Sequence, residues 1–217
     1  MLEIIEYNVY GLEEAAIASG LPMSVNTSVL TPNTDRLKRL GGAISGSGHD
    51  SALKGVLVRA RVKYPLYWTK QFQRYHFADI VSSQSTMHRI TKMNLDECFN
   101  KYTSKSVIEI VKSLVEIYNW MIDNNVDNVY LDDNEHFHIT KPDSGEFETC
   151  SKYNIFMRII STCPSGLEME MEIVTNYLQL KTIYEQRQHH KLKEDWGHFC
   201  EWIKGLPLLC DILEGGR

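Results

Sequence analysis

TNYLQLKTIYEQR, residues 175–187, is the stretch that most strongly predicts how this chain folds and what it binds. Five of its side chains recur at helical spacing and share one stripe of an α-helix: Asn176, Leu180, Ile183, Tyr184 and Arg187. The stripe begins with an amide, is apolar in the middle and ends in a guanidinium. A planar guanidinium near an amide suits an anionic, hydrogen-bonding ligand such as a nucleotide. The alternative interpretation is an amphipathic core helix with polar ends.

The segments around this motif predict a mostly helical protein with a few strands. We place the motif in one long helix over residues 167–191. Residues 105–124 form the clearest helix, because apolar side chains keep the i, i+3, i+4 spacing along its whole length. Residues 2–10 are rich in β-branched and aromatic types, and residues 56–62 alternate apolar and basic side chains, so both predict strands.

The other segments are shorter. Helices are expected at residues 12–19, 36–40, 49–54, 66–77 and 152–161. The glycine-rich segment 41–48 predicts a flexible turn, and residues 20–34 and 123–135 predict exposed loops. We therefore expect an α+β fold with a long central helix packed on a small antiparallel sheet. It should form a single domain over residues 1–217, with a helical C-terminal tail from about residue 194 to 217.

The composition narrows the class of protein. A chain of 217 residues that is 43% hydrophobic can bury a sizeable core, and a net charge of −5 does not indicate a nucleic-acid-binding surface. Glu3 and Glu6 interrupt the start of the chain, so no signal peptide is expected. No apolar stretch approaches the roughly 18 residues of a membrane span. The five cysteines form no C-x-x-C pair, so we expect free thiols in a cytoplasmic protein.

Two segments upstream of the motif carry further polar residues at defined spacing. One reads GHDS at residues 48–51, and the other reads QFQRYH at residues 71–76, followed by SSQSTMHR at residues 82–89. His49 and Arg74 stand 25 positions apart, and Asn176 and Arg187 stand 11 apart.

Together these segments resemble the flavin-dependent thymidylate synthase family. That family carries a Gly-His-x-Ser/Thr helix start, a Gln-x-x-Arg-His-Arg helix followed by a run with Ser, Glu and Arg, and a late Asn-x-x-x-Leu-x-x-x-x-x-x-Arg helix. The resemblance covers residues 46–90 and 150–200. It is nearest to divergent phage-encoded relatives, which share the N-terminal N-V-Y-G-L-E and the G-S-G-H turn.

The resemblance implies roles for ten residues. Ser51 would bind the flavin phosphate at a helix N-terminus, and Asn176 would hydrogen-bond the flavin. Gln71 would contact the uracil nucleotide, and Arg187 would hold its pyrimidine ring or its charge. The implied cofactor-binding set is Ser51, Arg74, Tyr75, His76, Asn176 and Thr182. The implied substrate-binding set is Gln71, Ser85, Arg89 and Arg187. No catalytic residue is assigned.

Several positions depart from the family pattern. The Arg-His-Arg signature reads Arg-Tyr-His here, so Tyr75 replaces the middle histidine and His76 replaces the second arginine. A histidine is only partly charged at neutral pH. Thr182 stands where the family has a second amide. Ser85 matches the family serine only with one inserted residue, and Arg89 matches the family arginine only with about three.

The implied activity is one-carbon transfer to C5 of a uracil deoxynucleotide, from dUMP to dTMP or a variant of that reaction. The family likeness implies flavin adenine dinucleotide (FAD) as cofactor, with NADPH and methylenetetrahydrofolate as co-substrates. It also implies a homotetramer whose active sites lie between subunits. A different class remains open, namely a non-catalytic nucleotide- or protein-binding member of the same fold.

The same residues also have structural interpretations. His49 fits a loop or cap, Arg74 a surface charge, Tyr75 and His76 a packing role, and Ser82 a helix cap. A metal site could be sought in two groups: His189, His190, His198 and Cys200, and His136, His138 and Cys150. Neither spacing matches an established zinc motif, so no metal is expected.

Overall fold

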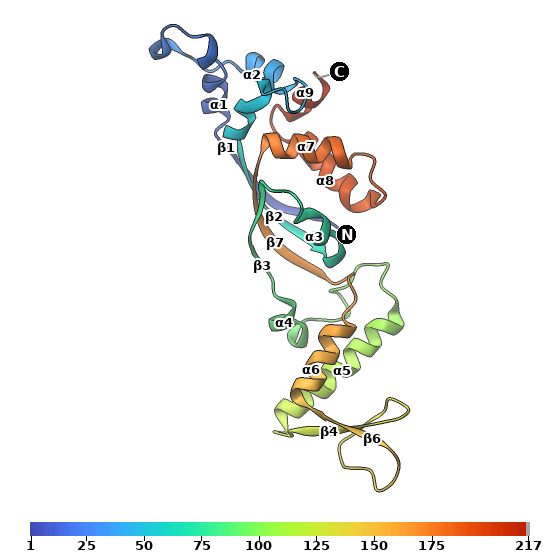
Figure 1. Cartoon of the computed structure of the whole chain (residues 1–217). Coiled ribbons are helices and arrows are strands. Elements are labelled where there is room, and N and C mark those ends of the chain that lie inside the picture. Colours follow the sequence, from blue (N-terminus) through green and yellow to red (C-terminus); the bar gives the residue numbers. More distant parts are fainter. Residues whose placement is uncertain (216–217) are drawn as a thin grey trace. The chain divides into compact units, whose positions relative to one another are not determined.

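The computed structural model describes residues 1–215, which divide into two compact units (Figure 1). The first unit comprises Met1–Ser83 and the chain from Met169 onward, and the second comprises Gln84–Glu168. Helices and small antiparallel sheets make up the fold, which confirms the predicted α+β class. A single domain over the whole chain stays a prediction.

The sheet of the first unit has four strands in the order β1-β2-β7-β3. β1 (Glu3–Tyr10) pairs antiparallel with β2 (Leu57–Pro65). β3 (Ala78–Ser83) pairs antiparallel with β7 (Glu168–Asn176). β7 therefore lies inside the sheet, between two strands that come much earlier in the chain (Figure 1).

The strand β7 shows that the predicted single helix over residues 167–191 is wrong. Its sequence EMEMEIVTN alternates polar and apolar side chains, which is the two-residue period of a strand with one buried face. Met169, Met171 and Ile173 are buried on that face. The chain becomes helical only in α7 (Tyr177–Arg187), and Asn176 is the N-cap of that helix.

An aromatic cluster forms the core of the first unit. Trp68 lies on α3 (Leu66–Phe72), is fully buried, and has its ring centroid 4.7 Å from Phe72 and 4.9 Å from Trp196. Such ring pairs stabilise a core by more than their buried area alone. Trp196 belongs to α8 (Lys193–Gly205), which packs beside α7 (Figure 1).

α3 is shorter than the helix predicted over residues 66–77. It ends at Phe72, and β3 begins at Ala78, whose backbone pairs with Thr175 of β7. The chain just after the predicted helix therefore pairs with β7, a strand about 100 residues later in the sequence. This tertiary pairing overrides the local helical pattern.

The rest of the first unit consists of short helices. They are α1 (Leu12–Ala18), α2 (Thr34–Gly41), α9 (Leu209–Glu214) and the 3-10 helices η1 (Leu21–Met23), η2 (Thr27–Val29) and η3 (His49–Gly55). α8 and α9 occupy the region of the predicted helical tail. Its last two positions, 216–217, lie outside the described residues.

The second unit combines a helix pair with a three-stranded sheet. α5 (Lys105–Asp123), the longest helix described, lies beside α6 (Lys152–Thr162) (Figure 1). The sheet order is β5-β4-β6, and β4 (Asn128–Asp132) is antiparallel to both β5 (Phe137–His138) and β6 (Phe147–Ser151). The short helices α4 (Thr86–Arg89) and η4 (Ile90–Lys92) precede α5.

β4 corrects the predicted exposed loop over residues 123–135. Val129 and Leu131 are buried, and their side chains alternate with less buried neighbours, as expected of a strand with one covered face. The acidic and amide residues around them had masked this short alternation.

No helix among the described residues is long and apolar enough to cross a membrane. All five cysteines lie in the described part of the chain, and none forms a disulfide.

Candidate functional site

The ten predicted site residues fall in both units. Eight belong to the first unit: Ser51, Gln71, Arg74, Tyr75, His76, Asn176, Thr182 and Arg187. Ser85 and Arg89 belong to the second unit, in and beside α4. Ser85 precedes α4 without a capping side-chain hydrogen bond, and Arg89 is exposed. The substrate-binding roles of these two residues stay predictions.

The segment after α3 meets the end of α7 through Tyr75 and Arg187. Arg187 Nε donates a hydrogen bond of 2.7 Å to the Tyr75 hydroxyl oxygen. That hydroxyl in turn donates to Gln186 Oε1 at 3.2 Å. Two predicted site residues that are 112 positions apart are therefore in direct contact.

Trp196 lies against the same guanidinium. The Arg187 guanidinium carbon is 4.7 Å from the Trp196 ring centroid and 5.5 Å from the Tyr75 ring centroid, so both rings are within cation–π range. Trp196 is fully buried, and its Nε1 donates to Gln71 Oε1 at 2.9 Å. Gln71 thus uses one lone pair of its carbonyl oxygen on Trp196, and its amide nitrogen remains available for the predicted nucleotide contact.

Sequence reasoning missed Trp196 and considered His190 as a member of a possible metal group. Trp196 lies in the first turn of α8, in the predicted tail, and no local pattern connects it with Arg187. The His190 ring centroid is 6.1 Å from that of Trp196. Burial, together with the charges of Arg187 and Lys191, lowers the pKa of His190 below its ordinary value, so this imidazole is mainly neutral near pH 7.

Arg74 and His76 flank Tyr75 on an exposed stretch. Within the part of the chain that the structure describes, neither side chain has a hydrogen-bond or ion-pair partner. Arg74 is thus an unpaired cation adjacent in sequence to the tyrosine that contacts Arg187. We also predict that the guanidinium groups of Arg74 and Arg187 lie at the rim of one cleft.

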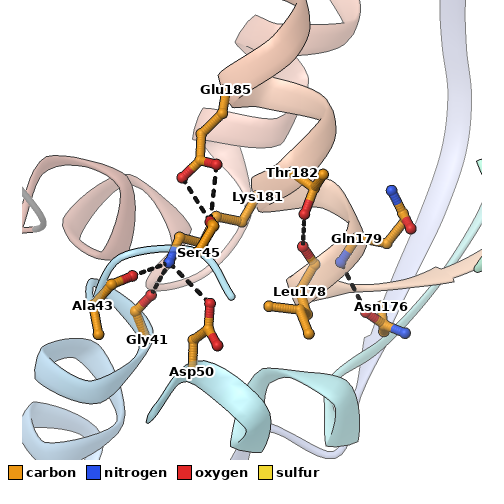
Figure 2. Close-up of polar contacts among 10 residues, drawn as sticks. All are labelled: Gly41, Ala43, Ser45, Asp50, Asn176, Leu178, Gln179, Lys181, Thr182 and Glu185. Atoms are coloured by element: carbon orange, nitrogen blue, oxygen red, sulfur yellow. Dashed lines mark hydrogen bonds and ion pairs between the residues drawn. The ribbon is translucent and has the colours of Figure 1, made fainter. Parts of the chain in front are cut away.

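Asn176 and Thr182 make local hydrogen bonds on α7, as Figure 2 shows. Asn176 Oδ1 accepts from the Gln179 backbone N–H at 2.9 Å, which caps the helix. The Thr182 hydroxyl donates to the Leu178 carbonyl oxygen at 3.0 Å. The Asn176 amide nitrogen has no partner among the described residues, so this side chain can cap the helix and still donate to a ligand.

The glycine-rich segment is attached to α7 by Lys181, a residue that sequence reasoning did not single out. Lys181 is 3% exposed, and its Nζ donates to the Gly41 carbonyl at 2.8 Å, to the Ala43 carbonyl and to Asp50 Oδ2 at 3.2 Å (Figure 2). One turn later, the Glu185 carboxylate accepts a hydrogen bond of 2.9 Å from the Ser45 hydroxyl.

This attachment places the GHDS segment near α7. Gly48 has a φ of 82°, a left-handed conformation that favours glycine, and η3 begins at the next residue. Asp50 is buried and bonded to Lys181, whereas His49 and Ser51 on the same segment are exposed. The predicted flavin ligand Ser51 is therefore accessible to a ligand, and its role stays a prediction.

The second unit contains two cavities beside Phe137. One has a volume of about 420 Å³ and includes Leu114 and Arg158, and the other has a volume of about 570 Å³ and includes Trp120 and His138. None of the ten predicted site residues lines either one. At the second cavity, His138 Nε2 is 2.9 Å from Asp132 Oδ2. Hydrogen bonding to His138 and to backbone N–H groups lowers the pKa of Asp132 to about 2.

No protein-family model matches this chain, and no curated protein is found as a relative. Solved structures do match. One is the flavin-dependent thymidylate synthase ThyX from Helicobacter pylori complexed with FAD and dUMP, at 13% identity and a TM-score of 0.58, covering 98% of this chain and 96% of that one. Another structure of ThyX from the same organism with FAD and dUMP has 14% identity and a TM-score of 0.60, covering 100% and 98%. At this identity the likeness establishes a shared fold.

Proposed function

We propose that this protein is a flavin-dependent enzyme that transfers a one-carbon unit to C5 of a uracil deoxynucleotide, converting dUMP to dTMP or carrying out a close variant. The observation that carries the proposal is the contact between Tyr75 and Arg187. It joins two segments that were singled out from sequence motifs, on a fold shared with proteins that bind FAD and dUMP.

The side chains present suit a phosphate-bearing ligand. Arg74 is an exposed cation without a protein partner, and Arg187 has no partner on its two Nη atoms among the described residues. A nucleotide and a flavin dinucleotide both carry phosphates, which arginine binds through charged hydrogen bonds. The free amide hydrogens of Asn176 and Gln71 could donate to carbonyl oxygens of a flavin or pyrimidine ring.

In this proposal the ten predicted residues divide between the two ligands. Ser51, Arg74, Tyr75, His76, Asn176 and Thr182 would hold FAD, and Gln71, Ser85, Arg89 and Arg187 would hold the nucleotide. Bound flavin would supply the redox chemistry, with NADPH as reductant and methylenetetrahydrofolate as one-carbon donor. The protein's own contribution would be orientation of the ligands and stabilisation of their charges.

The assembly and setting belong to the same proposal. We expect a homotetramer with sites between subunits, a cytoplasmic location and phage-encoded relatives. Light scattering on the purified protein would measure the mass of the assembly, and a monomer at micromolar concentration would contradict the tetramer.

A non-catalytic binding protein is the second candidate. Tyr75 and His76 stand where the resembling family has His and Arg, so the exposed segment after α3 carries less fixed positive charge. A protein with this site could retain a nucleotide without turning it over.

Absorbance spectroscopy and an activity assay separate these functions. A flavoprotein should show a band at about 450 nm, either as purified or after FAD is added and the excess is removed. It should form dTMP from dUMP when FAD, NADPH and methylenetetrahydrofolate are present. Nucleotide-induced thermal stabilisation without flavin retention or product would favour the binding protein, and no response to either ligand would contradict both candidates.

A further inference from the structure

The protein contacts the Arg187 guanidinium at its Nε atom and over one face. Its Nε–H is bound by Tyr75, and its planar group lies over Trp196. Tyr75 is itself oriented, because its hydroxyl hydrogen is donated to Gln186 and its lone pair is then left for Arg187. Trp196 is oriented by its hydrogen bond to Gln71.

The other end of the guanidinium is free. No described residue hydrogen-bonds to Nη1 or Nη2 of Arg187, and the side chain is only half-buried. Nη1 and Nη2 present two parallel N–H groups, which match two oxygens of one phosphate. A guanidinium that is already held in place loses less side-chain entropy on binding than a mobile one.

We propose that Tyr75 and Trp196 are positioning residues that hold Arg187 with its Nη1 and Nη2 atoms ready to bind one phosphate group. This inference deepens the proposed function and rests on it for the identity of the ligand. The phosphate could be that of a uracil nucleotide or one of those in FAD. Tyr75, which stands where the resembling family has a histidine, then has a role of its own. Its hydroxyl makes the contact that orients Arg187.

Gln71 takes a different role in this arrangement. Its carbonyl oxygen is bound to Trp196, so it acts on Arg187 through the tryptophan ring. The chain of contacts runs from Gln71 to Trp196 to Arg187 on one side, and from Gln186 to Tyr75 to Arg187 on the other. Burial and the charges of Arg187 and Lys191 lower the pKa of His190, so this neighbour of Trp196 is mainly neutral.

A double-mutant cycle tests the positioning role in the full-length protein. The variants are Tyr75→Phe, which removes only the hydroxyl, Arg187→Lys, which keeps the charge but loses the planar fork, and the two combined. Tyr153→Phe, at an exposed tyrosine on α6, is the matched control. Calorimetry measures binding of inorganic phosphate, dUMP, deoxyuridine and FAD to each variant.

Tyr75→Phe should weaken binding of the phosphate-bearing ligand about tenfold, because a hydrogen bond to a charged group is lost. It should leave deoxyuridine, which lacks the phosphate, unaffected. In the Arg187→Lys background the same change should have no further effect, because Tyr75 acts through Arg187. A decrease for dUMP but not for FAD would assign the phosphate to the nucleotide, and the reverse would assign it to the flavin.

The inference and the proposed function can fail separately. If dUMP and FAD bind but Tyr75→Phe changes neither affinity, or its effect simply adds to that of Arg187→Lys, the positioning role is overturned and the function stands. If inorganic phosphate shows the coupled effect while dUMP and FAD bind no more tightly than phosphate, the positioning role stands and the function is overturned. Absence of binding by all of the probes contradicts both.

A measurement without ligand checks the geometry itself. The Arg187 Nε–H resonance should be protected from exchange with solvent in the unmodified protein and in Tyr153→Phe, and this protection should be lost in Tyr75→Phe. Equal exchange rates in all three proteins would show that the hydrogen bond does not hold the arginine in solution.

Discussion

Two cations on helix α7 differ in how completely the protein satisfies them. Lys181 is buried, and its three donors are taken by two carbonyl oxygens and the Asp50 carboxylate. Arg187, near the end of the same helix, is half-buried and has one described hydrogen bond together with two aromatic faces. A cation whose donors are all used can only support the fold, whereas one with donors to spare can bind a ligand.

The contrast also explains how the site is built. Lys181 and Glu185 attach the glycine-rich segment to α7, so the GHDS residues have a fixed neighbour. Arg187 contacts the segment after α3 instead. Helix α7 thus contacts two segments that are far apart in sequence. Lys181 binds the glycine-rich segment, and Arg187, the candidate ligand-binding residue, binds the segment after α3.

The largest expected effect is that of Lys181→Met. It removes the buried cation and leaves the Asp50 carboxylate without its partner, so the free energy of unfolding should fall by about 3–5 kcal/mol. Urea denaturation measures this change. Lys54→Met, at an exposed lysine on η3, is the control and should stay within about 0.5 kcal/mol. A loss below about 1 kcal/mol for Lys181→Met would show that the buried pair does not hold the loop.

Arg187→Ala should have the opposite profile. The unliganded protein should lose only about 1 kcal/mol, the contribution of cation–π contacts at a partly exposed site. The increase in Tm on adding the ligand whose phosphate Arg187 holds, dUMP or FAD, should disappear, because the phosphate-binding donors are gone. Arg39→Ala on α2 serves as the control for a lost surface charge. If Arg187→Ala instead destabilised the free protein by several kcal/mol, Arg187 would belong with Lys181 as a structural residue.

Asp132 extends the comparison to a carboxylate of the second unit whose hydrogen bonds are satisfied. Its pKa of about 2 lies below the ordinary value near 4, so its stabilisation is fully present above about pH 4 and is lost as the pH falls through about 2. Asp132→Asn should therefore lower the urea midpoint at pH 6, and the difference from the unmodified protein should shrink toward pH 2. Parallel pH profiles for the two proteins would show that the His138 contact contributes no stability.

The smallest expected effect is that of His76→Arg. It adds a full charge beside Arg74 and should tighten FAD binding by about two- to threefold at low salt, with less gain at higher salt. Fluorescence titration of FAD at two salt concentrations measures the effect. His198→Arg on the exposed face of α8 makes the same charge change elsewhere. Equal gains from both variants would mean that the effect comes from net charge and not from the site.

Local patterns in the sequence were enough for several elements. The long apolar periodicity of residues 105–124 predicted α5 nearly to its ends, and the β-branched residues 2–10 predicted β1. Asn176 was predicted to lie inside a helix over residues 167–191, whereas the structure makes it the N-cap of α7. The alternation in EMEMEIVTN was also present in the sequence, but a continuous helical interpretation of residues 167–191 concealed it.

The sequence by itself determined the α+β class, most helices and the pairing of motifs that suggested a flavin- and nucleotide-binding fold. Only the tertiary structure decided which cation is buried and which is available, because that depends on what arrives from elsewhere in the chain. Carbonyl oxygens of residues 41 and 43 satisfy Lys181, and Tyr75 and Trp196 meet at Arg187 from opposite directions in sequence. Lysine and arginine carry the same charge in the sequence, and the fold decides how many of their donors are left unpaired.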